Sequence, residues 1–98
     1  MTLRVIFKPD AEAEMEQAHA WYERHQAGLG DEFLRCVDAC IASVQRNPEL
    51  YPVAHNQIRM ALVRRFPYLV FYTPEAYQIT VLSVFPAARD PQIWKRRV

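Results

Sequence analysis

The amino-acid sequence predicts an α+β domain in which an αα-hairpin packs on one face of an antiparallel β-sheet. Three observations lead to this prediction. A short β-branched and aromatic segment opens the chain, two long stretches with helical periodicity follow it, and three strand-like stretches with short connections come last. The expected order is therefore β-α-α-β-β-β with a short C-terminal helical tail. The chain has 98 residues, enough for one apolar core, and we assign residues 1–98 to a single domain.

The N-terminal part of the chain predicts one strand and one helix. Residues 3–7 are rich in β-branched and aromatic side chains, and Pro9 ends this strand. Apolar residues then recur with a helical period to about residue 26. Asp10 is the expected N-cap of this first helix, because its short side chain can accept a hydrogen bond from a free backbone N–H.

The two glycines of the chain, Gly28 and Gly30, predict the joint between the first helix and a second one. The second helix is expected to begin at Gly30 or Asp31 and to end at Asn47-Pro48. Because this joint is short, the two helices should run antiparallel as a hairpin.

The C-terminal half predicts a three-stranded meander. Residues 50–53 are expected to form a loop between prolines, and residues 58–64 show an interrupted alternation. Residues 67–72 are apolar throughout, as in a strand covered on both faces, and residues 77–84 alternate more cleanly. Short connections make neighbouring strands antiparallel. After a loop, residues 91–97 predict the helical tail, with a proline at a first-turn position.

Charge is distributed unevenly, although the net charge is only +1. Residues 9–32 hold seven acids and one base, whereas residues 59–98 hold seven bases and two acids. The paired carboxylates of the first helix, Glu12, Glu16 and their neighbours, are explained by a solvated face. Six of the seven bases in the second range are arginine, which suits bidentate contacts with carboxylate or phosphate. The basic half therefore predicts a binding surface.

The sequence carries no recognisable catalytic or cofactor motif. Cys36 and Cys40 lie four residues apart on the second predicted helix, and we interpret them as small core thiols. The alternative is half a metal site completed by His19, His25 or His55, but no ligand cluster accompanies the cysteines. Phosphate-binding loops and nucleophile motifs are missing as well. We expect no metal and no cofactor.

The remaining candidates are basic residues with aromatic neighbours. A strand edge beside a basic tail can form a concave cationic surface, which would bind nucleic-acid backbone or an acidic partner peptide. The candidate binding residues are Arg59, Arg64, Arg65, Tyr68, Arg89, Trp94, Lys95, Arg96 and Arg97.

At this point the chain resembles the RelE/ParE superfamily of toxins from type II toxin–antitoxin systems, and the ParE branch more closely. The resemblance covers essentially the whole chain and rests on motifs that occur in order. They are Ala18-x-x-Trp21-Tyr22-Glu23, Leu29-Gly30-x-x-Phe33-Leu34, Ile41-x6-Pro48-x-x-Tyr51-Pro52, Arg59-x-x-Leu62-x-x-Arg65-Phe66-Pro67-Tyr68-Leu69-Val70-Phe71-Tyr72, and Val81-x-x-Val84-Phe85-x3-Arg89-Asp90-Pro91-x-x-Trp94.

The resemblance implies the fold described above and a toxin that a cognate antitoxin neutralises in a heteromeric complex. ParE-like toxins inhibit DNA gyrase and serve plasmid stabilisation, whereas RelE-like toxins cut mRNA on the ribosome. In a ribonuclease of this kind, the catalytic residues here would be Arg59, Arg64, Arg65 and Arg89.

This chain departs from the ribonuclease pattern at several positions. Arg59 fits it, but the next position on the same strand face is Ala61, and a basic position on the following strand falls at Tyr68 or Leu69. No tyrosine occurs after Tyr77. Without a second cation or a convincing acid or base, cleavage would lack stabilisation of the developing phosphate charge. We therefore favour a gyrase inhibitor over an enzyme, and a non-toxic antitoxin-binding module is a third alternative.

The chain has no apolar run near the ~18–20 residues of a membrane span, and its N-terminus does not resemble a signal peptide. We expect a cytoplasmic protein without membrane contact.

Overall fold

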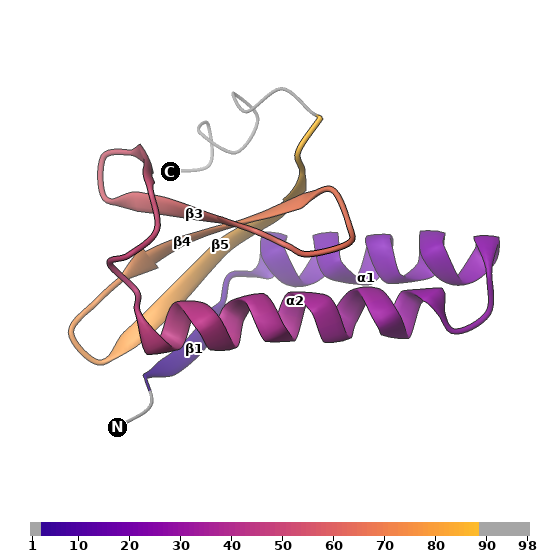
Figure 1. Ribbon diagram of the computed structural model, residues 1–98, viewed down its shortest axis with the longest axis horizontal. Coiled ribbons are helices and arrows are strands. Elements are labelled where there is room, and N and C mark those ends of the chain that lie inside the picture. Colours follow the sequence, from indigo (N-terminus) through magenta and orange to yellow (C-terminus); the bar gives the residue numbers. More distant parts are fainter. Residues whose placement is uncertain (1–2, 89–98) are drawn as a thin grey trace.

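The computed structural model describes residues 3–88. Its elements are β1 (Arg4–Phe7), α1 (Pro9–His25), α2 (Leu29–Arg46), β2 (Val53–His55), β3 (Ile58–Leu62), β4 (Tyr68–Pro74) and β5 (Gln78–Pro86). The two helices lie side by side along one face of the sheet (Figure 1). The predicted α+β class with a helical hairpin on a sheet is confirmed. The predicted tail at residues 91–97 lies outside the described residues.

The sheet differs from the predicted one in two details. Its strand order is β1-β5-β4-β3-β2, and β1 pairs with β5 in parallel, so the sheet is mixed and not antiparallel throughout. Parallel pairing needs a long crossover, which the helical hairpin and the meander together supply. The second difference is β2: residues 50–53 were expected to be a loop, but Val53 begins a short edge strand that pairs with Arg59 of β3.

Both helices begin slightly earlier than the sequence suggests. Pro9 occupies the first turn of α1 and Lys8 is the N-cap, so Asp10 lies inside the first turn, where its charge suits the positive end of the helix. Helix α2 begins at Leu29, and its N-cap Gly28 has a φ of +88°. Glycine adopts this left-handed conformation without a steric penalty.

Gly30 allows the two helices to approach closely. A Cβ atom at this position would lie 2.6 Å from the backbone oxygen of His19 and 2.6 Å from Cγ of Glu23. The contact with the His19 oxygen excludes a side chain at Gly30, because that oxygen belongs to the backbone of α1 and cannot move aside. The lack of a side chain at Gly30 therefore sets the spacing of α1 and α2.

The main core lies between the helices and the sheet. Phe33, Val37 and Val44 of α2 are buried against sheet residues such as Val70 and Val81. The opposite face of the sheet carries a smaller apolar cluster, whose buried members are Ile58, Phe71 and Phe85. Strand β4 contributes to both clusters, which explains why its sequence is apolar throughout.

Tyr72 ties the loop after α2 to the core. Its side chain is fully buried, and its hydroxyl donates a hydrogen bond to the carbonyl oxygen of Pro48 at 2.7 Å. Burial raises the pKa of the Tyr72 hydroxyl to about 12. The guanidinium of Arg59 reinforces the same loop by donating to the carbonyl oxygens of Glu49 (3.1 Å) and Tyr51 (2.6 Å).

Neither α1 nor α2, the helices within residues 3–88, is sufficiently long and apolar to cross a membrane.

The buried hydrogen bond of Tyr72 leads to a first prediction. Tyr72→Phe should lower the free energy of unfolding by about 1–2 kcal/mol, because the Pro48 carbonyl oxygen loses its buried donor. Urea denaturation would show a lower midpoint with an unchanged slope. Tyr77→Phe is the matched control, since Tyr77 is 81% exposed and removal of its hydroxyl leaves no buried group without a partner. Equal midpoints for the two variants would contradict the anchoring role of Tyr72.

Candidate functional site

Two of the predicted binding residues, Arg64 and Arg65, line a groove between α2 and β3. It has a volume of about 770 Å³. Arg59 does not line the groove, but it donates to the carbonyl oxygen of Tyr51, which does. The groove is lined by Glu32, Arg35, Cys36, Ala39, Cys40, Ser43, Tyr51, Leu62, Arg64 and Arg65.

A single carboxylate organises the arginines at one end of the groove. Glu32, in the first turn of α2, accepts hydrogen bonds from Arg35 at 2.5 Å and from Arg65 at 2.8 Å. The hydrogen bond from Arg35 is the main reason that the pKa of Glu32 is lowered, and the hydrogen bond from Arg65 acts in the same direction. The two arginine side chains are nevertheless about two-thirds exposed, at 66% and 64%. Their guanidinium groups therefore retain N–H donors that can face a partner.

The backbone at Arg65 is unusual. Its φ of +72° lies in the left-handed region, which costs about 1–2 kcal/mol for a residue with a Cβ atom. The neighbouring Phe66 is buried in the main core and offsets this cost. The turn between β3 and β4 thus holds the Arg65 side chain over α2, at a position where glycine would be the unstrained choice.

Tyr68, another predicted binding residue, lies elsewhere. Its ring packs on Tyr22 and Phe33 next to the main core, and it borders a second cavity of about 470 Å³ between α1 and strands β4 and β5. Trp21, which is 48% exposed, lines the same cavity. The structure therefore separates Tyr68 from Arg64 and Arg65. The other predicted binding residues lie outside the described part of the chain: Arg89, Trp94, Lys95, Arg96 and Arg97.

The ribonuclease positions considered above are occupied by apolar groups. Ala61 is 2% exposed and belongs to the main core. Leu69 packs against the cluster on the opposite sheet face. A cation at position 61 would be a buried charge, which is costly without a partner.

The two cysteines form part of the groove floor. Cys36 and Cys40 are free, partly buried and packed against the main core, in agreement with their interpretation as core thiols. The Cys40 thiol lies 3.7 Å from the carbonyl oxygen of Leu62, to which it donates, and burial raises its pKa to about 11. Cys40 is therefore a poor nucleophile at neutral pH.

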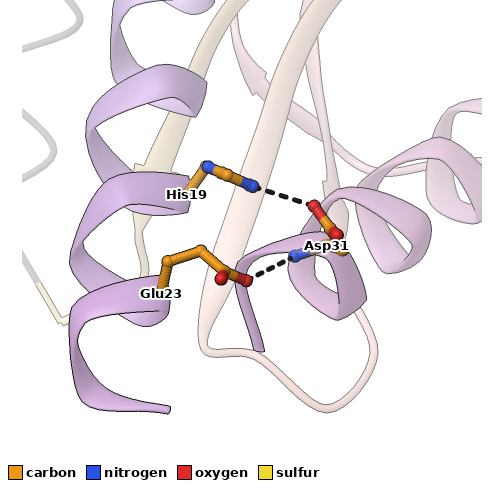
Figure 2. Close-up of side chains that lie close together, drawn as sticks. All are labelled: His19, Glu23 and Asp31. Atoms are coloured by element: carbon orange, nitrogen blue, oxygen red, sulfur yellow. Dashed lines mark hydrogen bonds and ion pairs between the residues drawn. The ribbon is translucent and has the colours of Figure 1, made fainter. Parts of the chain in front are cut away.

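A cluster at the joint of the helices has the donor atoms of a metal site. Figure 2 shows His19 and Glu23 of α1 facing Asp31 of α2, and one ligand atom from each lies within 4.8 Å of the others. His19 Nε2 is 3.0 Å from Asp31 Oδ1. The sequence gives no sign of this cluster, because its members are separated by a turn and do not have the spacing of metal ligands.

The contacts of Glu23 show that this cluster caps a helix. Its carboxylate accepts hydrogen bonds from the backbone N–H groups of Gly28 (3.2 Å), Gly30 (2.8 Å) and Asp31 (3.4 Å). These groups are the free donors at the N-terminus of α2. The hydrogen bond from Gly28 is the main reason that the pKa of Glu23 is lowered. The positive end of the helix also disfavours a cation here, so we interpret Glu23 as a cap supplied by the preceding helix.

This cap predicts a specific pH dependence. The pKa of Glu23 is below its ordinary value of 4.5 in the folded chain, so its stabilising effect is present above that value and is lost as the pH falls through the lowered pKa. Glu23→Gln should lower the thermal midpoint at pH 7, and the difference from the wild type should shrink in acid. Glu16→Gln on the same helix is the control and should leave the midpoint unchanged at both pH values. A rise of the midpoint with Zn²⁺ that His19→Ala abolishes would instead identify a metal site.

Comparisons with known proteins place the chain in a family. Residues 5–91 match the family model described as the ParE toxin of the type II toxin–antitoxin system parDE. A search of curated proteins finds no significant match. Among solved structures, the fold is similar to that of a chain from a chromosomal ParDE toxin–antitoxin system of P. aeruginosa, with a TM-score of 0.76 and 11% sequence identity, covering 87% of this chain and 96% of the other. The chain belongs to the ParE family of type II toxins.

Proposed function

We propose that this chain inhibits DNA gyrase, that it does not cut RNA, and that a cognate antitoxin encoded beside it neutralises it. The observation that carries the proposal is the match to the ParE toxin model over residues 5–91, nearly the whole chain. The similar structure from P. aeruginosa is described as a ParDE system, which pairs a toxin with an antitoxin. In this role the protein acts in the bacterial cytoplasm, where gyrase and its DNA are found, and serves plasmid stabilisation.

The geometry supports an inhibitor better than a nuclease. Cleavage of RNA needs an acid or base at the reacting oxygens and cations that stabilise developing charge on the phosphate. Within residues 3–88, Arg59 donates hydrogen bonds to carbonyl oxygens of the loop after α2, and Arg65 donates one to Glu32. Between them, Ala61 is buried. These arginines serve the fold and a surface. The carboxylate that meets Arg65, that of Glu32, already accepts hydrogen bonds from Arg35 and Arg65, which lower its pKa and make it a weak base.

A binding function needs only exposed guanidinium groups. An exposed guanidinium can bind a carboxylate or a backbone phosphate without any reaction centre. Arg64 and Arg65 offer such groups on the turn between β3 and β4. The basic C-terminal residues of the sequence, Arg89 and residues 95–97, would add positive charge for binding gyrase or the antitoxin.

A supercoiling assay tests the proposed target. Purified protein should inhibit the supercoiling of relaxed plasmid by gyrase, and it should increase the linear DNA released from stalled gyrase by detergent and protease. Pre-incubation with the product of the adjacent gene should restore supercoiling, which is the control for a neutralising antitoxin. Translated mRNA should remain intact after induction.

Three results would contradict this proposal in different ways. Undiminished supercoiling at micromolar protein would reject gyrase as the target. Codon-specific mRNA cuts within minutes of induction would favour the ribonuclease alternative with Arg59, Arg64, Arg65 and Arg89. Normal growth of cells that express the chain without its neighbour would favour a non-toxic antitoxin-binding module.

A further inference from the structure

The sheet face opposite the helices carries an apolar cluster that is more deeply buried than an open sheet surface would be. Its members Phe71 and Phe85 are each only 2% exposed. Both helices that the structure describes lie along the other face (Figure 1). The burial of these two rings therefore calls for a further covering layer. The cluster, called here the opposite-face cluster, consists of Ile58, Phe71 and Phe85 with the partly buried Ala54, Met60, Leu69 and Leu82.

Neighbouring strands alone do not account for this burial. Side chains stand roughly perpendicular to a sheet, so their neighbours cover the sides of a phenylalanine ring but not its outer edge. Leu62 provides an internal comparison, because alternation along β3 places it on the same face as Ile58 and Met60. Leu62 is 66% exposed, as expected of an uncovered position. The covering layer thus lies over Phe71 and Phe85 and does not extend to Leu62.

The covering layer belongs to this chain, because the exposed fractions are those of a single chain. Outside the described part lie residues 1–2 and 89–98. Residues 1–2 span at most about 7 Å, and they precede Arg4, which pairs with Gln78. Phe85 is seven residues farther along β5, about 23 Å from that pair. The N-terminal residues cannot reach the cluster, which leaves the C-terminal segment.

The C-terminal segment has a suitable length and composition. Strand β5 ends at Pro86, next to Phe85, and ten residues, 89–98, follow the described part. Ten residues extend up to about 33 Å, whereas β5 and β3 lie only about 10 Å apart across β4. The segment contains one apolar pair, Ile93 and Trp94, and three bases follow it directly. A tryptophan ring has a large apolar area, so burying it against aromatic side chains is favourable.

We propose that residues 89–98 fold back over the opposite-face cluster and that Trp94 packs on Phe71 and Phe85. The three bases that follow Trp94 are then held beside a rigid sheet. Trp94 is a positioning residue in this arrangement: its ring faces the sheet, and it fixes the cations that contact a partner. Fixed charges lose less entropy on binding than charges on a free chain end. The positioning role rests on the proposed function, because it takes gyrase as the partner, whereas the docking itself does not.

Tryptophan fluorescence tests the docking directly. Trp21→Phe leaves Trp94 as the single tryptophan of the full-length chain and keeps an aromatic ring beside His25. The emission of Trp94 should lie at shorter wavelength than in the urea-unfolded chain. Its quenching by acrylamide should be at least about threefold slower than in the unfolded chain, because the ring is buried. Neither value should change on dilution.

Two lysine substitutions in the Trp21→Phe chain test the location of the docking site. Met60→Lys places a charge in the opposite-face cluster and should restore most of the acrylamide quenching of Trp94. Leu50→Lys is the matched control, since Leu50 is 76% exposed in the loop after α2, and it should leave the quenching unchanged. Circular dichroism checks that each variant is folded.

Gyrase inhibition tests the positioning role. Trp94→Ala keeps every basic residue of the chain, yet about tenfold more protein should be needed for half-maximal inhibition of supercoiling, as for loss of an anchoring residue. Trp94→Phe should restore most of the inhibition, because a phenylalanine ring also packs on an aromatic cluster.

The outcomes separate the docking from the proposed function. Quenching of Trp94 that is equally fast in the folded and unfolded chains would overturn the docking. Protection that persists in Met60→Lys would place the segment elsewhere, such as in the cavity between α1 and strands β4 and β5, and protection lost on dilution would identify a second copy as the covering layer. Either result also overturns the docking. Full inhibition by Trp94→Ala would overturn the positioning role, whereas a wild-type chain that leaves gyrase active would reject the proposed function and not the docking.

Discussion

The close packing of α1 on α2 at Gly30 is the constraint on which the rest of this structure depends. A backbone oxygen of α1 occupies the space where a side chain at Gly30 would lie, and the Glu23 carboxylate of α1 binds the free N–H groups of α2. Sterics therefore fix the distance between the helices, and the cap fixes where α2 begins. The first turn of α2 then lies where Glu32 can reach Arg65 in the turn between β3 and β4. The helix packing at Gly30 and the Glu23 cap thus place the first turn of α2 beside the turn between β3 and β4, where the groove lies.

Carboxylates serve the architecture at three separated places. Glu14 of α1 accepts hydrogen bonds from the Ser83 hydroxyl at 2.9 Å and from the Val84 N–H at 3.1 Å, beside the part of β5 that extends past β1. Glu23 caps α2, and Glu75 accepts hydrogen bonds from the side chains of Thr80 at 2.6 Å and Gln78 at 2.9 Å at the β4–β5 turn. In each case a glutamate side-chain oxygen accepts hydrogen bonds from backbone or side-chain donors outside the regular hydrogen bonds of the helices and strands. The acidic first half of the chain is thus more than a solvated face.

The arginines divide between structural and surface roles in a way that bears on function. Arg59 stabilises the loop after α2 through two carbonyl oxygens, and that loop also receives the Tyr72 hydroxyl. Arg65 is shared between the fold and the groove, since its ion pair with Glu32 leaves the side chain 64% exposed. A surface built in this way offers fixed positive charge at the edge of a rigid sheet. Binding to another macromolecule needs no more than that, whereas phosphodiester cleavage would also need a proton-transfer group at the same point.

The sequence by itself determined the fold class, because helical and strand periodicities report directly on which side chains are buried. The alternation in residues 58–64 and the apolar run at residues 67–72 both follow from the clusters on the two sheet faces. Only the tertiary structure decided the pairing of β1 with β5, the edge strand β2 and the separation of Tyr68 from Arg64 and Arg65. These features depend on contacts between residues far apart in the chain, and local patterns carry no information about which distant partner is chosen. The same holds for His19, Glu23 and Asp31, which a turn brings together because glycine lets two helices touch.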